Sequence, residues 1–561
     1  MALLIFPSAA ISGLPLPLSA LFVLFLFVTV ILLATYLYTT LRYRLSLRRY
    51  TLGPARPTTA SPPPQIPYTI PFIGNAYSLL ISPPGVFWKQ LFRWHPRATG
   101  ACTLLLGGRP THFIYSPHAV QALLKARGPT RDSLNLDVAQ KGLGIASRDV
   151  QTYYGFGEPA DPATGLTPTQ QQEKMNHDFL LRGERVNELT AEFTRALAEL
   201  VAAEPCCDQD VGLCAWLARG MFRASTEAVM GRAILDVVEG LVDDFWEFDR
   251  GFMNMLYDLP SWFMPKSYQA RAKILDGMEK WHAMLQEKSN DRPDPEGGVG
   301  WDPLFGSRAN RAKHRYFEAR GLSLRARAGL DLGFIFGLSS NAIPATGWML
   351  MHILNPEGDK TLLRRVMEEV ETAKREDGTV DIPTLISLPL LQSVFHEVLR
   401  LYVDVWVTRE LKDDLILPLD DEKKQVFLKK NGIVVAPSSL GHRDEARWLN
   451  PPSEAFYAER FLRTHPETGK AVFSLDGTTG KFYPFGGGKS ICPGRVFAKQ
   501  EVLGSVAMML LAFEFDVVGF VDEQGRSKKH FPTLRNTFSG SGVMPTDGDI
   551  RVKMRRRDTK A

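Results

Sequence analysis

Between Phe485 and Gly494 the chain reads FGGGKSICPG, and the run RVFAKQE, which suits a helix, follows directly. The glycines allow positive φ angles, so the backbone can fold tightly around the Cys492 sulfur and point N–H groups at it. A helix that begins just after the cysteine turns its positive end toward the sulfur and favours the thiolate. Phe485 can shield the sulfur from water. These features predict that Cys492 is a thiolate ligand of iron; the alternative is a glycine-rich turn around a buried cysteine.

Charged residues upstream of this loop form a second pattern. Glu397 and Arg400 lie in the predicted helix LLQSVFHEVLR, three residues apart, so they share a helix face and can form an ion pair. Such pairs are common on solvated helices, and this pair alone indicates little. Further along the chain, the segment FYAERF supplies a second arginine, Arg460.

The helix ExxR, the FYAERF segment and the cysteine loop together resemble the cytochrome P-450 family, whose members have an ExxR helix, a PERF-like segment and a loop FxxGxRxCxG. The resemblance covers nearly the whole chain after an N-terminal apolar run. It implies a mainly α fold with a small β region, and a haem b whose iron is bound by Cys492. Phe485 and Gly488 of the loop would then be cofactor-binding residues.

The resemblance also implies roles for the charged residues. Glu397, Arg400 and Arg460 would form a buried triad that stabilises the haem-binding core, which is a structural role. Arg409, on an expected strand, matches the family position that pairs with a haem propionate, and a guanidinium suits that task.

Two positions depart from the family pattern. The loop usually has an arginine two residues before the cysteine, but Ser490 stands there, so one propionate partner is missing. The Trp-and-Arg pair of an earlier helix is also absent from the segment QQEKMNH, where Lys174 or His177 either substitutes or has no role. Similar loops without the arginine occur in the branch that contains sterol 7-alpha-hydroxylases and prostacyclin synthase, and many fungal tailoring enzymes are similar.

The oxygen-activating helix departs as well, in the segment FGLSSNAIPAT. Asn341 takes the place of the usual threonine and Ser340 the place of the usual acid, so both are candidate catalytic residues. Pro344 removes one helical hydrogen bond and should bend the helix, which frees carbonyls near Ser340 for a water molecule. The branch with this Asn-then-Pro arrangement contains both monooxygenases and an isomerase.

The resemblance therefore implies a haem enzyme that takes electrons from an NADPH-dependent reductase, splits O2 and inserts one oxygen atom into a lipophilic substrate. By analogy to similar fungal sequences, the substrate would be a terpenoid, sterol-like or polyketide intermediate of secondary metabolism. Two alternatives stay open at this point. One is a haem-thiolate isomerase or dehydratase that acts on a peroxide without a reductase, and the other is a non-catalytic haem-binding membrane sensor.

The N-terminal part predicts a membrane anchor. An uncharged apolar run extends from Leu18 to Tyr38, which is enough helix to cross a bilayer, and the basic flank Arg42 to Arg49 should stay cytoplasmic. The run is too long for a signal-peptide core, and no charged segment precedes it. We expect an anchor over residues 1–49, a Pro-rich hinge over 50–75 and a catalytic domain over 76–561, attached to the endoplasmic reticulum membrane and facing the cytoplasm.

Composition adds limits on partners and redox chemistry. The 561 residues carry a formal charge of only +5, which does not indicate a nucleic-acid partner. The five cysteines match neither a secreted disulfide framework nor paired zinc knuckles, so a reducing compartment is expected. Cys206 and Cys207 could form a metal site with Cys214, but no His or second CxxC accompanies them, so these thiols are expected to have no role.

Apolar periodicity predicts mostly helices and few strands. The helices are expected over 186–201, 224–248, 330–352, 360–374 and 390–401. One hairpin is expected, with strands over 425–429 and 432–436 around the Asn431-Gly432 turn.

Overall fold

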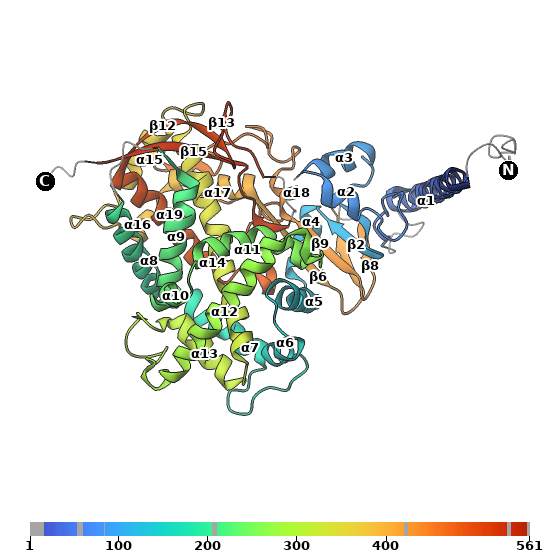
Figure 1. The fold of residues 1–561 in the computed structure, drawn as a ribbon. Coiled ribbons are helices and arrows are strands. Elements are labelled where there is room, and N and C mark those ends of the chain that lie inside the picture. Colours follow the sequence, from blue (N-terminus) through green and yellow to red (C-terminus); the bar gives the residue numbers. More distant parts are fainter. Residues whose placement is uncertain are drawn as a thin grey trace. The chain divides into compact units, whose positions relative to one another are not determined.

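The computed structural model describes residues 16–52, 60–83, 85–204, 210–419, 424–535 and 540–557. The chain forms two compact units, Met1–Thr130 with Thr408–Pro437, and Arg131–Val407 with Ser438–Ala561. Each unit is described by itself, and Figure 1 gives the element labels.

The first unit combines short helices with a small sheet. Its helices are α1 (Leu16–Leu52), α2 (Ala76–Ile81), α3 (Val86–Trp94) and α4 (Pro117–Lys125). Its strands are β1 (Ala101–Leu106), β2 (Arg109–Ile114), β7 (Leu415–Pro418), β8 (Gln425–Leu428) and β9 (Ile433–Pro437). Strand β2 pairs antiparallel with β1 and parallel with β9.

The predicted hairpin is wrong in its pairing. Both strands form, and Asn431 adopts the left-handed φ of 64° that the Asn-Gly turn requires. However, β8 pairs with β7, and β9 pairs with β2. The turn therefore does not close a hairpin, because β8 pairs with the strand just before it in the chain and β9 pairs with β2, which is distant in sequence.

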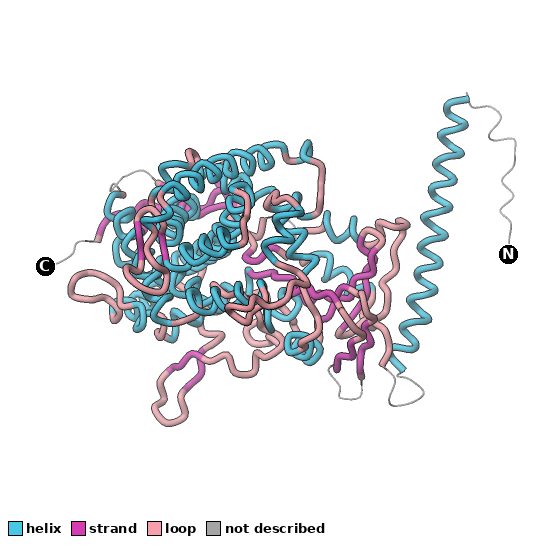
Figure 2. Tube along the Cα trace, turned by 90° about the horizontal axis from the view of Figure 1, so that it is seen from below, coloured by secondary structure: helices cyan, strands magenta, loops and turns pink. Residues whose placement is uncertain are grey.

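Helix α1 is a single long apolar helix, as Figure 2 shows. Its part from Ala20 to Arg48 has a mean hydropathy of 2.7 and is long and apolar enough to cross a membrane. Near its C-terminal end, the hydroxyl of Tyr50 donates to the carbonyl oxygen of Thr99, at 2.6 Å.

The Pro-rich segment after α1 is partly attached to strands. Pro54 and Pro57 lie outside the described residues. The N–H of Ile66 donates to the carbonyl oxygen of Thr103, at 2.9 Å, and Ser61 forms a bridge beside β8. Residues 61–66 are therefore extended, as the prolines predict, and are held by backbone hydrogen bonds rather than free.

The second unit is mainly helical. Its helices are α5 (Asp132–Asp137), α6 (Ser147–Tyr154), α7 (Pro168–Leu180), α8 (Gly183–Ala203), α9 (Leu213–Met230), α10 (Ala233–Val237), α11 (Leu241–Leu256), α12 (Pro265–Glu287), α13 (Arg308–Ala319), α14 (Leu324–Leu354), α15 (Leu362–Glu371), α16 (Ile382–Leu385), α17 (Pro389–Tyr402), α18 (Ser438–His442) and α19 (Arg495–Ala512). Helix α14 packs against α9, α12, α17 and α19 and so forms the middle of this unit (Figure 1).

Most predicted helices of this unit are present. The expected helix over 224–248 is wrong, because three helices, α9, α10 and α11, occupy that region. Gly231, with a positive φ of 91°, ends α9, and Gly240, with a positive φ of 69°, lies just before α11 begins.

Short strands complete the second unit. Strands β12 (Phe513–Asp522), β13 (Ser527–Lys528), β15 (Gly548–Arg556) and β3 (Val211–Gly212) form a sheet in the order β13-β12-β15-β3. Smaller pairs join β4 (Trp301–Asp302) with β5 (Gly306–Ser307) and β10 (Leu462–Thr464) with β11 (Ala471–Phe473). Strand β14 (Ser541–Val543) pairs with the first residues of β6 (Val403–Glu410), beside α14.

Candidate functional site

The cysteine loop folds back tightly before α19 begins. Gly486 and Gly488 adopt positive φ angles of 71° and 67°, which side chains with a Cβ rarely tolerate. The N–H of Cys492 donates to the carbonyl oxygen of Phe485, at 3.0 Å, and closes the loop. Phe485 is partly buried and packs against the main hydrophobic core. Helix α19 starts at Arg495, three residues after the cysteine.

The surroundings of the Cys492 sulfur act on its pKa in two directions. Burial is the largest effect and raises the pKa of the thiol, although hydrogen bonds from the backbone N–H groups of Gly494 and Arg495 counteract part of it. The positive charges of Arg495 and Arg131 also favour the thiolate. A half-buried sulfur with two N–H donors, two nearby cations and a helix N-terminus is equipped to bind a metal ion as a thiolate.

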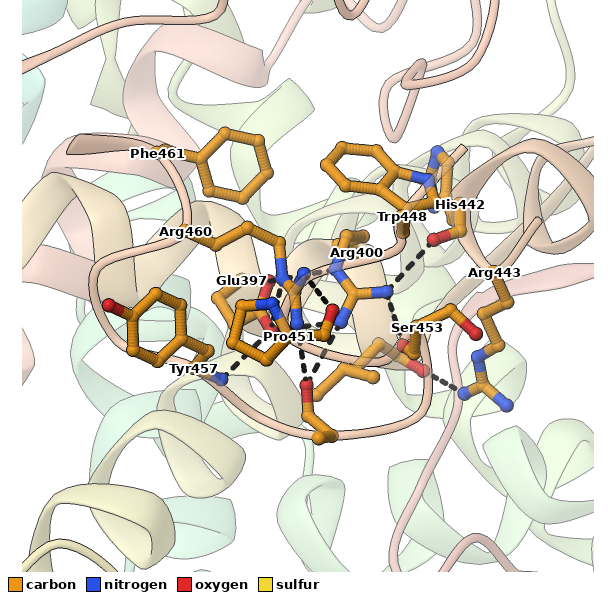
Figure 3. Close-up of polar contacts among 12 residues, drawn as sticks. Glu397, Arg400, His442, Arg443, Trp448, Pro451, Ser453, Tyr457, Arg460 and Phe461 are labelled. Atoms are coloured by element: carbon orange, nitrogen blue, oxygen red, sulfur yellow. Dashed lines mark hydrogen bonds and ion pairs between the residues drawn. The ribbon is translucent and has the colours of Figure 1, made fainter. Parts of the chain in front are cut away.

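The structure brings Glu397, Arg400 and Arg460 together in one buried cluster (Figure 3). Arg400 donates from Nε and Nη2 to the two oxygens of Glu397, both at 2.8 Å. Arg460 donates from Nε to the same carboxylate, at 2.9 and 3.0 Å. Each guanidinium also donates to backbone carbonyls, including those of His442 and Pro451, so the charges are compensated by hydrogen bonds as well as by each other.

His442 connects this cluster to the cysteine loop. Its carbonyl oxygen accepts from Arg400, at 3.0 Å, and its Nε2 accepts from the N–H of Tyr483, at 3.0 Å, just before the loop. Burial lowers the pKa of the His442 imidazole, so the ring stays a neutral acceptor. The triad therefore fixes the backbone from which the loop starts.

One face of α14 is left partly uncovered within the helical unit. Gly337 is exposed, and a Cβ placed on it would meet no heavy atom within 4 Å. Ser340, Asn341 and Pro344 follow at helical spacing on the same face and are half-buried, whereas the Ser339 side chain between them is buried. The two candidate catalytic residues therefore share this face of α14.

Asn341 is held by β14. Its Oδ1 accepts from the N–H of Val543, at 2.9 Å. A Cβ on Gly542 would lie 2.0 Å from Oδ1, so only glycine allows this approach. The amide oxygen of Asn341 is thus occupied by a backbone N–H, which leaves the NH₂ group for donation.

Comparison with known proteins decides the family. A model of the family described as cytochrome P450 matches residues 63–544. The chain belongs to the cytochrome P450 family. It is 30% identical over 469 residues to cytochrome P450 monooxygenase calL of Penicillium decumbens, covering 80% of this chain and 85% of that protein. It is 28% identical to cytochrome P450 monooxygenase efuG of Hormonema carpetanum, over 90% of each chain.

A mammalian protein is a more distant relative. The chain is 24% identical over 524 residues to cholesterol 7-alpha-monooxygenase of Cricetulus griseus, covering 88% of this chain and 93% of that protein. The relatives named above are monooxygenases, so this P450 is an oxidoreductase of the P450 monooxygenase family.

The residues of the second unit fit the haem that this family binds. Besides the Cys492 thiol, the unit offers Arg131, whose Nε is buried and has no hydrogen-bond partner among the described residues. The charge of Arg131 also lowers the pKa of Cys492, so the guanidinium acts electrostatically on the sulfur. A buried guanidinium with an unused donor suits a cofactor that carries carboxylates.

Sequence reasoning missed Arg131, because it precedes a short helix and belongs to none of the recognised motifs. The residues considered for this task lie elsewhere. Lys174 and His177 are largely exposed on α7 and both pair with Asp178, so the structure favours no cofactor role for them. Ser490 lies in the short 3₁₀ turn Gly488–Ser490. Strand β6 crosses the boundary between the units, and Arg409 lies in the part that belongs to the first unit. Its side chain is buried, and its Nη1 donates to the carbonyl oxygen of Thr408, at 2.9 Å.

Another buried cluster of titratable residues joins α12, α13 and α14. Lys313 Nζ lies 2.8 Å from Oδ1 of Asp331. The other oxygen, Oδ2, lies 2.8 Å from His314 Nε2 and 3.0 Å from His282 Nε2. Because the Lys313 ammonium already neutralises the carboxylate, the cluster is explained as a structural ion pair. Cys206 and Cys207 lie outside the described residues.

Proposed function

We propose that this P450 binds haem b through Cys492 and hydroxylates, or otherwise oxidises, a lipophilic small molecule with O2 and electrons from an NADPH-dependent reductase. The balanced reaction consumes substrate, O2, NADPH and one proton, and gives oxygenated substrate, water and NADP⁺. The geometry of the Cys492 loop carries the proposal, because two N–H donors and two cations surround a half-buried sulfur. When bound there, haem supplies O2 binding and O–O cleavage assisted by the thiolate.

The protein's own residues hold the cofactor and shape its surroundings. Arg131 supplies a guanidinium group for a propionate, since Ser490 stands where the family usually has an arginine. Arg409 is proposed as a propionate partner from its match to the family position. Phe485 and Gly488 belong to the loop that encloses the sulfur. Glu397, Arg400 and Arg460 stabilise that loop through His442. On α14, the Asn341 NH₂ orients water or a dioxygen-derived oxygen atom.

The substrate we propose is a terpenoid, a sterol-like molecule or a polyketide intermediate of secondary metabolism. Two observations support an apolar substrate. Half-buried apolar residues, Phe336 and Leu338, flank the uncovered Gly337 on α14. One relative is named for its action on cholesterol, and others are fungal monooxygenases.

We further propose that α1 anchors the enzyme in the endoplasmic reticulum membrane with the catalytic part in the cytoplasm. Support comes from the apolar length of α1 and from the arginines between Arg42 and Arg49 that follow the apolar run.

Labelled dioxygen tests the reaction type. Membranes that contain the full chain, an NADPH-dependent reductase and NADPH are supplied with isotopically labelled O2 and with cholesterol, or with a panel of terpenoids and polyketides. Mass spectrometry should find one labelled oxygen atom in a product, formed only with NADPH. Conversion of an organic peroxide without NADPH, together with no labelled product from the panel, would instead indicate an isomerase.

A further inference from the structure

A carboxyl group from another helix lies beside Ser340, on the partly uncovered face of α14. The Ser340 hydroxyl donates to Oδ1 of Asp249 on α11, at 2.6 Å. The two helices also meet through aromatic rings, since the centroids of Phe252 and Phe336 are 4.1 Å apart. Asp249 is three residues from Phe252, so its carboxyl projects from the same side of α11. The acid that α14 itself lacks at position 340 is therefore supplied by α11.

The two arginines that act electrostatically on Asp249 form ion pairs with other residues. Arg250 on the same helix pairs with Glu247, at 3.0 Å. Arg535, from the segment before β14, pairs with Glu523. Burial raises the pKa of Asp249 to about 6, because it outweighs the hydrogen bond from Ser340 and the through-space effect of both arginines, which lower the pKa. A carboxyl with this pKa takes up and releases protons close to neutral pH.

The hydrogen bond between the two groups can reverse. When Asp249 is ionised, Ser340 donates to it. When Asp249 is protonated, the carboxyl can donate to the Ser340 oxygen, and the serine hydrogen is free to turn toward the face that carries Asn341. Ser340 is thus placed to pass a proton from the Asp249 carboxyl to the face of α14 that carries Asn341.

We propose that Asp249 and Ser340 together form the proton donor of this active site, with the acid on α11 and the hydroxyl on α14. This inference rests on the proposed monooxygenase function. In each transfer, Asp249 gives its proton to the Ser340 oxygen, and Ser340 gives its own proton to water or to a dioxygen-derived oxygen atom. Solvent then reprotonates Asp249, while NADPH supplies the electrons through the reductase.

An infrared titration tests whether Asp249 holds the proton. In the purified full-length holoenzyme, the carbonyl band of one protonated carboxyl should disappear with a midpoint near pH 6. The band should be missing from Asp249→Asn and present in Asp243→Asn, a matched control at an exposed position of the same helix. If Asp249 is already ionised well below about pH 5, close to an ordinary carboxyl, the proposal is overturned.

The fate of dioxygen tests whether the proton is used. Reductase and NADPH are added to the holoenzyme, and O2 is the only acceptor. Water needs four protons and four electrons per O2, whereas hydrogen peroxide needs two of each. In Asp249→Asn and Ser340→Ala, water formation should fall by about 10-fold to about 100-fold while peroxide per NADPH rises. The rise in water formation as pH falls through about 6 in the wild type should also be lost.

Matched variants separate this role from a structural one. Asp249→Glu restores a carboxyl and should recover part of the water formation, and Asp243→Asn should match the wild type. Haem content and thermal midpoint are measured for every variant. An Asp249→Asn enzyme with the wild-type product ratio and pH profile would overturn the proposal. If the wild type itself consumes no NADPH with O2, the proposed monooxygenase function fails, and the infrared titration still tests Asp249.

Discussion

At position 131, an arginine side chain lies near the Cys492 sulfur with one buried donor unused. We expect Arg131→Ala to weaken haem binding, because a hydrogen bond between charged groups contributes about 1.5–3 kcal/mol, or roughly 10-fold to 100-fold in haem dissociation. Haem transfer to apomyoglobin measures this rate. Arg409→Ala should also speed haem loss.

Arg127→Ala is the control for the Arg131→Ala and Arg409→Ala variants, since Arg127 is exposed and is not proposed to contact a propionate. Unchanged haem loss in Arg131→Ala would mean that another cation faces the cofactor.

Replacement of Asn341 should affect the reaction rather than haem binding. The side-chain oxygen of Asn341 accepts a hydrogen bond from the Val543 N–H. Asn341→Ala should leave haem content and substrate affinity nearly unchanged but should divert NADPH electrons to hydrogen peroxide, because the amide no longer orients the proton source. Product per NADPH is the quantity to measure. Unchanged coupling would place the essential contact on Ser339 or Ser340 instead.

Single residues differ in how far the sequence predicts them. The tight loop around Cys492 and the helix that follows it were predictable, because both are local features. The proposed roles of Arg131 and Asp249 were not predictable, because each depends on a side chain that is distant in sequence. Nothing local marks Asp249 as the partner of Ser340, and its elevated pKa exists only once α11 and α14 are packed together.

Between helices α9 and α19, a buried acid makes stability depend on pH. Glu501 is 1% exposed and accepts from the Ser225 hydroxyl, and burial raises its pKa to about 8. Between about pH 4.3, where the unfolded group ionises, and about pH 8, the folded state binds more protons than the unfolded state. The free energy of unfolding therefore falls as pH rises through this window, and the stabilisation by the proton is complete only below it.

Glu501→Gln should remove this pH dependence, because an amide keeps the acceptor for Ser225 but does not ionise. Near pH 8 the variant should be more stable than the wild type by roughly 2–4 kcal/mol, with little difference near pH 4. Urea unfolding midpoints across this range measure the effect. Glu514→Gln, at an exposed position, is the control. Parallel pH profiles for the wild type and Glu501→Gln would contradict the raised pKa.

Whole elements were predictable where periodicity is strong and uninterrupted. The apolar pattern over 330–352 predicted the middle of α14, and Pro344 lies inside that helix as expected. The pattern over 224–248 failed, because apolar spacing continues across Gly231 and Gly240 although the backbone turns there. Strand pairing failed for a different reason. The turn between β8 and β9 has favourable local chemistry, but β8 pairs with the preceding strand β7, and β9 pairs with β2 from a distant part of the sequence.

For the whole chain, α1 should be separable from haem binding. A chain that lacks the residues before Arg42 should still bind haem but lose membrane attachment that resists carbonate. Tyr43, Leu47 and Tyr50, which are buried against the first unit, are retained in this truncation. Sedimentation after carbonate extraction and the haem-to-protein ratio measure the two properties. Carbonate-resistant membrane association of the truncated chain would show that α1 is not the only anchor.

The central claim is that Cys492 binds the haem iron as a thiolate. The absorption spectrum of the reduced, carbon-monoxide-bound protein tests it most directly, since thiolate ligation shifts the main band to longer wavelength. The wild type and a Cys214→Ser control, which removes a free thiol elsewhere in the second unit, should show the shifted band, and Cys492→Ala should lose it. A Cys492→Ala protein that binds haem and keeps the shifted band would contradict the account.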